Sequence, residues 1–168
     1  MLELDHVWSK MLDEAAFKAS NAGRQDIVDY LRLKATNDAI RKAGVSWLFD
    51  TVIEIASDAL RDRRNITIER EEPHNFARGN SNMVGSLLEI RQGVRCLSVA
   101  AGWARTPSDG IMLSGALAFA RISHFGMPKF GAEIRLVHGD SLPQWLGEDD
   151  SIIESSEISR HFEIFLGS

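Results

Sequence analysis

The chain has 168 residues, the length of one ordinary globular domain. Apolar residues make up 44% and charged residues 26%, values that exclude a disordered, collagen-like or coiled-coil chain. The 19 basic and 24 acidic residues give a formal charge of -5, so the chain has no broad basic field with which to hold nucleic acid or an anionic membrane.

Cysteine usage and apolar runs bear on the compartment and on cofactors. Cys96 is the only cysteine, which excludes an internal disulfide and a cysteine-rich zinc site. Residues 1–5 are acidic and lack the basic and apolar regions of a signal peptide, and no apolar run approaches the roughly 18 residues of a membrane span. Histidine spacing matches no metal motif. We therefore predict a cytoplasmic protein with no membrane partner, no metal and no cofactor.

Residues 4–64 have a helical pattern. Apolar side chains recur there at steps of three and four, which places them on one face of a helix that ends near Gly23. A second helix is predicted over 25–43, and Ser46 is a suitable N-cap for a third. The alternative is a single long helix over both segments, with a kink at Gly44.

After this helical part the apolar pattern changes to a period of two, which is typical of strands. Polar residues, Gly and Pro predict a loop over 71–82, and Pro107 with Gly110 predicts a tight turn. The connection 139–159 is expected to contain a short helical turn around Trp145. The predicted strands are 66–69, 83–91, 94–103, 111–123, 133–138 and 161–166.

Helices followed by strands that short turns connect indicate an α+β fold with an antiparallel sheet. We predict two or three N-terminal helices packed on a five- or six-stranded, mostly antiparallel sheet. The chain 1–168 is expected to form a single domain, with a helical part at 1–64 and a sheet part at 65–168. This order of elements is similar to that of cone-shaped NTF2-like domains and of small secretion-chaperone-like folds. The likeness is one of topology alone, because no motif carries it, and no family is identified.

The predicted strand 111–123 has large residues on one face and small residues on the other. Large side chains such as Leu117 and Phe119 suit the face that meets the helices, and the opposite face carries mainly alanine. Neither face carries a charge before Arg121, so we expect the centre of the sheet to be covered on both sides. The alanine-rich face would be covered by another segment of the chain, by a second copy in a homodimer, or by a ligand in a hollow.

Polar and aromatic residues near loops supply a candidate pocket at the sheet edge. A histidine among three carboxylates around the 71–82 loop could act as a base, although such loops are more often solvated connections. A tryptophan, an arginine and an aspartate surround the turn at Pro107, and tryptophan and arginine are typical of recognition surfaces. An arginine and a histidine end the strand 111–123, where the arginine could bind a carboxylate or phosphate, or pair with a glutamate across the sheet. The candidate pocket residues are His74, Trp103, Arg105, Asp109, Arg121 and His124.

Two functions from different classes agree with these observations. The first is a non-enzymatic domain that binds a small ligand or another protein and forms a homodimer, because both sheet faces are apolar and no catalytic motif is present. The alternative is a cofactor-free enzyme that acts on a small anionic substrate in a pocket at the sheet edge. The predicted partners are a second copy of the chain and a small anionic ligand, with no nucleic acid.

Overall fold

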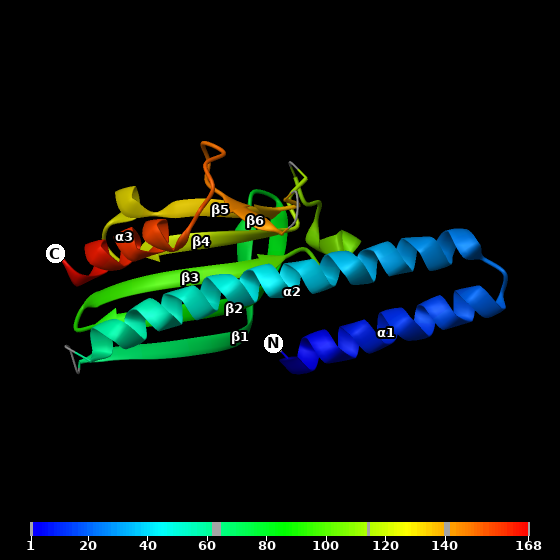
Figure 1. Cartoon of the computed structure of the whole chain (residues 1–168), viewed down its shortest axis with the longest axis horizontal. Coiled ribbons are helices and arrows are strands. Elements are labelled where there is room, and N and C mark those ends of the chain that lie inside the picture. The colour runs from blue at the N-terminus through cyan, green and yellow to red at the C-terminus, as the bar shows by residue number, and fades with distance from the viewer. Residues whose placement is uncertain (1, 62–64, 114, 140–141, 168) are drawn as a thin grey trace. The chain divides into compact units, whose positions relative to one another are not determined.

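The chain forms an α+β structure in which helices precede and follow an antiparallel sheet (Figure 1). The computed structural model describes residues 2–61, 65–113, 115–139 and 142–167. Within these residues there are three α-helices and a six-stranded sheet, which confirms the predicted fold class. The elements are α1 (Leu2–Asn21), α2 (Gln25–Leu60), β1 (Ile66–Arg78), β2 (Ser81–Gln92), β3 (Arg95–Trp103), β4 (Ala118–His124), β5 (Ala132–Val137), β6 (Gln144–Leu146) and α3 (Ser155–Leu166).

The chain divides into two compact units, Met1–Ala43 and Gly44–Ser168. The boundary between these two units lies inside α2, and a single domain with a helical part at 1–64 and a sheet part at 65–168 stays a prediction. The first unit is a helical hairpin of α1 and the first part of α2, which run antiparallel (Figure 1). Inside it, the Trp8 indole N–H donates to the Asp38 carboxylate over 2.6 Å.

Residues 25–60 form one continuous helix, which decides between the two predicted alternatives. Gly44 is a packing glycine and not a helix stop. A Cβ at Gly44 would lie 2.5 Å from Leu136 Cδ2, so the missing side chain lets β5 come close to the helix. The Trp145 indole N–H also donates to the Gly44 carbonyl over 2.9 Å. These contacts fix the second half of α2 against β5 and β6.

The six strands follow one another across the sheet in chain order, and every neighbouring pair is antiparallel. The predicted loop 71–82 is wrong for most of its length, because β1 continues to Arg78 and β2 begins at Ser81. The register of this pair shifts between Glu71 and His74. A bulge of this kind accommodates Pro73, which cannot donate to a regular ladder, so the strand continues beyond it.

Three further expectations in the second half of the chain are wrong. The strand predicted over 111–123 begins only at Ala118, and an irregular segment with a short 3-10 turn precedes it. Trp145 lies on the short strand β6 and not on a helical turn. The segment predicted as a strand over 161–166 belongs to α3. Polar and apolar residues alternate in the first part of 161–166, which is typical of a strand. Over the whole of α3, however, the buried side chains Ile158, Phe162 and Phe165 are spaced by four and three residues, which is typical of a helix.

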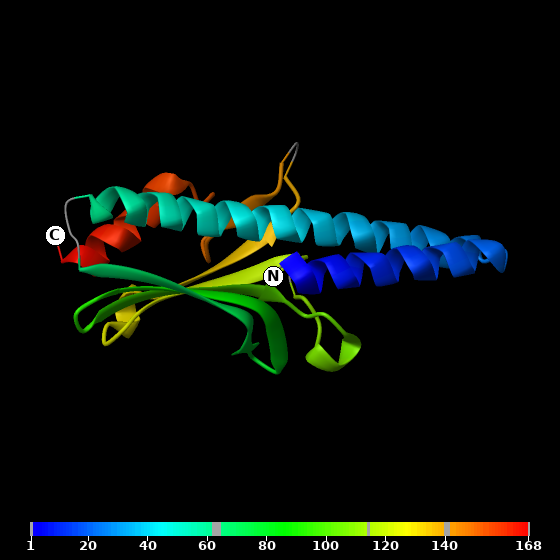
Figure 2. The same ribbon diagram turned by 90° about the horizontal axis from the view of Figure 1, so that it is seen from below.

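One face of the sheet is covered by the second half of α2 and by α3 (Figure 2). This face carries the alanines at 101, 118 and 120 together with Ile122, and all four are buried. The sequence assigned the large residues to the helix side, and this is wrong. Small side chains let the helices approach closely, whereas Phe119 lies on the opposite face. There it packs with Met83 and Ala116, which confirms that both faces are covered at this point.

Candidate ligand-binding site

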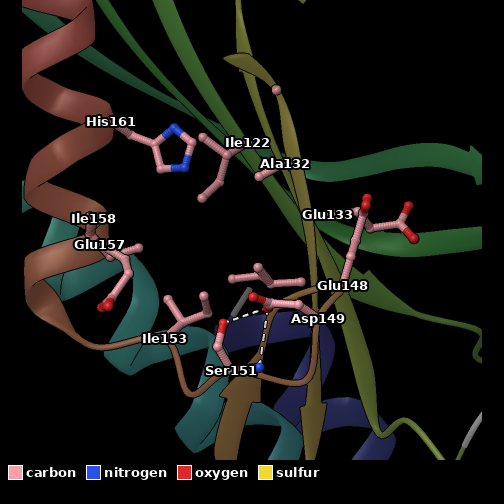
Figure 3. A pocket seen from close by; sticks show the side chains of 13 residues that line it. Ile122, Ala132, Glu133, Glu148, Asp149, Ser151, Ile153, Glu157, Ile158 and His161 are labelled. Carbon is pink, nitrogen blue, oxygen red and sulfur yellow. Dashed lines mark hydrogen bonds between the residues drawn. The ribbon is translucent and has the colours of Figure 1, made fainter. Parts of the chain in front are cut away.

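The candidate site lies at the outer edge of β5. Strand β6 pairs only with residues 135–137 of β5, so Ala132, Glu133 and Ile134 have a described partner strand on the β4 side alone. After β6 the chain makes a turn in which the Gly147 N–H donates to the Ser151 carbonyl over 2.9 Å. It then enters α3. The open edge of β5, this turn and α3 therefore surround a hollow on the helix side of the sheet (Figure 3).

The first cavity in this hollow has a volume of about 380 Å³. Its apolar part consists mainly of isoleucine side chains from β4, β5, α3 and the segment before α3. Figure 3 shows the His161 ring directed toward Ile122, with the Asp149 and Ser151 side chains bonded to each other at the opposite end. Cavities of this size accept small ligands. The lining residues are Ile122, Gly131, Ala132, Glu133, Ile134, Gly147, Glu148, Asp149, Ser151, Ile153, Glu157, Ile158 and His161.

A second cavity of about 390 Å³ adjoins the first, because the two share Ile122, Glu133 and Glu148 among their lining residues. This cavity extends along the end of β4, where Arg121 and His124 line it. A third and smaller cavity, about 190 Å³, also includes Glu133 and Glu148. Glu148 thus lies where all three cavities meet.

A histidine pair, His124 buried and His161 half-buried, connects the two larger cavities. His124 of β4 and His161 of α3 share a hydrogen bond of 3.0 Å between His124 Nε2 and His161 Nδ1, and their rings are stacked. Burial lowers the pKa of His124 below its usual value. Burial also lowers the pKa of His161, with smaller contributions from His124 and Arg160. Both rings are therefore mainly neutral at pH 7, and a ring N–H of one histidine donates the hydrogen bond to the bare ring nitrogen of the other.

The other ring nitrogen of His124 lacks a partner. His124 is only 4% exposed, and its Nδ1 makes no hydrogen bond to any described residue. Buried polar atoms in native proteins nearly always have a partner, and an exception calls for an explanation. His124 also lines the second cavity, and a ligand there would supply that partner if the ring turned to expose Nδ1.

The rim of the first cavity is acidic. Glu133, Glu148, Asp149 and Glu157 line it, and no lysine or arginine is among its lining residues. Hydrogen bonds from Ser151 lower the pKa of Asp149, and the hydrogen bond from the Glu154 N–H lowers the pKa of Glu157, so both stay ionised at neutral pH. Glu133 is already paired with Arg78 at 2.8 Å. The remaining carboxylates make the rim attractive to a cation.

The six residues predicted from the sequence lie in three separate places. Arg121 and His124 line the second cavity. At the turn after β3, the Arg105 guanidinium lies 3.7 Å from the centre of the Trp103 ring, and the Asp109 carboxylate accepts a hydrogen bond from the Arg105 backbone N–H over 3.0 Å. His74 lies on β1 and not in a loop. These last four residues line none of the three cavities described above, and Trp103, Arg105 and Asp109 hold the turn together.

Sequence reasoning missed the residues that α3 and the preceding turn contribute. His161 and Glu157 are four residues apart on α3, which places them on the same side of the helix. Their spacing would have identified them if the segment had been interpreted as a helix. Glu148 was noted only as part of an acidic run, because its position depends on where β6 ends.

No protein-family model matches the chain, and comparisons with curated proteins and with solved structures found no match. In the described part of the chain, no group of three or more His, Cys, Asp or Glu side chains is arranged to hold a metal ion. No helix in this part combines the length and the hydropathy that crossing a bilayer requires. The function is therefore inferred from the geometry of the site.

Proposed function

We propose that the protein is a non-catalytic binding domain whose two adjoining cavities hold a small ligand with a positive charge and an apolar part. The observation that carries this proposal is the buried His124 Nδ1, which has no described partner and belongs to a residue that lines a cavity. The paired ring of His161 faces the adjoining cavity. A ligand that spans both would fill the apolar space, and a turn of the His124 ring would bring its nitrogen to the ligand. A cytoplasmic location stays a prediction from the sequence.

The charges of the site favour a cation over the anion predicted from the sequence. Arg121 is the one arginine that lines the second cavity, and its guanidinium already donates to the Ala77 carbonyl over 2.9 Å and lies 3.6 Å from Glu133. Glu148 extends into the junction of the cavities without such a partner among the described contacts. An ammonium or guanidinium group near Glu148 would therefore gain more than a carboxylate would.

The enzymatic alternative has less support. A histidine pair can move protons, but four of the six residues predicted for catalysis or substrate binding line none of the described cavities. Arg105 and Asp109 are also engaged in holding a turn. In the first cavity the Ser151 hydroxyl and backbone N–H both donate to the Asp149 carboxylate, so this pair is likewise engaged in closing a turn.

A matched pair of probes tests the binding proposal. The n-hexylammonium cation and the hexanoate anion have the same chain length and opposite charge. We expect the cation to raise the melting temperature of the protein and hexanoate to leave it unchanged, because a ligand that prefers the folded state stabilises it. Loss of one partly exposed charge in the variant Glu148→Gln should weaken the cation about fivefold.

The matched control is Glu54→Gln, which removes an exposed carboxylate from α2 outside the cavities. This variant should bind the cation as the wild type does. The proposal is wrong if hexanoate stabilises the protein as much as the cation, or if neither probe has an effect at millimolar concentration.

Homodimerisation is part of the proposal, and the helical hairpin is the surface that favours it. Val7 and Met11 are each 54% exposed, Phe17 is 69% exposed and Leu33 is 61% exposed. A hairpin of two helices leaves such side chains in water, and pairing with the same hairpin of a second copy would cover them in a four-helix arrangement. Light scattering should give twice the mass of the chain. Phe17→Ser should shift it toward the monomer, and Lys10→Ala on the same helix should not.

A further inference from the structure

The open stretch of β5 also presents unpaired backbone groups. The Leu136 carbonyl accepts from the Leu117 N–H on the β4 side, over 2.8 Å. Backbone groups of successive strand residues face opposite edges, so those of Ala132 and Ile134 face β4 as well. The N–H and C=O of Glu133 then face away from β4, in the direction of β6.

The short length of β6 leaves these groups of Glu133 without a strand partner in the described part of the chain. Trp145 supports the assignment of edges, because its carbonyl faces away from β5 and accepts from the Ile153 N–H over 2.8 Å. Strand β6 therefore bonds to β5 through the residues on either side of Trp145, and it ends opposite Arg135. Along this edge of β5, Glu133 is the next residue after Arg135 whose backbone groups face outward, and β6 ends before it could pair with them.

Nothing in the sequence of this edge blocks another strand. Protein edges that avoid strand pairing carry proline, lysine or a bulge. Residues 131–134 contain no proline or lysine, and the register of β4 with β5 is regular over Ala132–Ile134; Glu133 is the one charged residue, and its carboxylate is paired with Arg78. Both larger cavities lie along this edge. An added strand would therefore have backbone partners and room for its side chains.

We propose that the ligand of this site is an extended peptide segment with alternating basic and apolar residues, which adds to the sheet as a strand opposite residues 131–134. This inference rests on the proposed binding function and names the ligand class. One peptide residue would exchange two hydrogen bonds with Glu133, as in other cases of strand addition. Its two neighbours would point to the helix side of the sheet, into the cavity lined by Ile122, Ile134 and Ile158.

The charge of the rim selects the residues that point to the helix side, where the apolar stem of a lysine would pack on the isoleucines and its ammonium group would reach the rim. Glu148, Asp149 and Glu157 surround the cavity, and no basic residue lines it. Basic side chains on a peptide would complement these carboxylates, whereas acidic ones would be repelled. His161 lines this cavity and His124 lines the adjoining one, so the hydrogen-bonded pair stands between the two spaces that peptide side chains could enter.

Backbone methylation of a peptide gives a test with the unaltered protein. The probe is a blocked six-residue peptide in which lysine and valine alternate, with a fluorescent label for anisotropy. Two derivatives carry N-methyl groups, one on the amides of the lysines and the other on the amides of the valines. Successive amides of a strand face opposite edges, so only one derivative should lose binding, by roughly tenfold or more, and the other should bind as the parent peptide does.

Equal binding of both derivatives would mean electrostatic adsorption and would overturn strand addition. A peptide in which glutamate replaces lysine should not bind, and its binding would also overturn the inference. If n-hexylammonium stabilises the protein but no peptide binds, strand addition fails and the binding function stands. If neither binds, both fail.

Two variants at position 133 provide a second test of the proposed pairing. Glu133→Pro removes the N–H that faces the open edge, whereas Glu133→Gln keeps it and removes only the charge. Proline is tolerated in edge strands at such positions, and circular dichroism verifies that the variant is folded. We expect Glu133→Pro to bind the parent peptide at least about fivefold more weakly than Glu133→Gln does. Equal affinities would contradict the proposed pairing with Glu133.

Discussion

Acidification should destabilise the protein through the His124–His161 pair. The pKa values of His124 and His161 are both lowered in the folded chain, mainly because burial disfavours the charged ring. The unfolded chain therefore binds protons near the ordinary histidine pKa of about 6.5 while the folded chain does not. The free energy of unfolding is therefore not reduced by these histidines above that pH, and it decreases as the pH falls below it.

The size of the effect follows from the number of protons. Each proton that only the unfolded state binds lowers the free energy of unfolding by about 1.4 kcal/mol per pH unit. Two histidines that stay neutral give a limiting slope of about 2.7 kcal/mol per pH unit. Arg160 contributes a positive charge that opposes protonation of His161, and Glu133, Glu148, Asp149 and Glu157 are the carboxylates that line its cavity.

Urea unfolding followed by circular dichroism between pH 5 and pH 7.5 measures this slope. Carboxylates with lowered pKa values, such as Asp149, titrate below this window and do not contribute to it. The single variant His161→Gln should lose about half of the slope and the double variant with His124→Gln nearly all of it, whereas His138→Gln, at an exposed position, should leave it unchanged. A wild type and a double variant with the same pH dependence would refute the reasoning.

Other predictions concern the packing of the sheet and are measured by urea unfolding. Gly44→Ala gains up to about 1 kcal/mol of helix propensity but places a Cβ against Leu136, and we expect a net loss of about 1–2 kcal/mol. No loss would mean that Leu136 moves aside freely. Gly85→Ala directs a Cβ at the Ala101 carbonyl, which is rigid backbone, so the loss should exceed that of Gly44→Ala. Trp145→Phe removes the hydrogen bond to Gly44 and should cost about 1 kcal/mol, and a larger loss would indicate a cavity as well.

The sequence predicts the fold class better than it predicts the site. Apolar periods separate the helical part from the sheet part, and the positions of turns such as that at Pro107 give the meander its order. Short sequence windows give the wrong element where the structure depends on a longer stretch of the chain or on its pairing partner. The period of residues 161–166 is ambiguous in six residues and helical in twelve, and the bulge near Pro73 allows a strand through a segment with the composition of a loop.

The site depends on features that no local pattern contains. His124 meets His161 because α3 returns across the sheet, and Glu148 lies at the cavity junction because β6 ends after Leu146. The prediction that the large residues of β4 face the helices was wrong for a related reason. Phe119 was expected under the helices, but the alanines beside it allow closer helix packing, and Met83 and Ala116 provide an apolar environment for the phenylalanine.

The consecutive order of the strands has a consequence for synthesis of the protein. Each strand can pair with the previous one as it leaves the ribosome, so the sheet grows hairpin by hairpin without long-range searching. Helix α3 is made after all six strands, and its buried side chains Ile158, Phe162 and Phe165 come last. Until then the apolar surface around Ile122 lacks part of its cover, and a nascent chain paused at this stage is a substrate for chaperones.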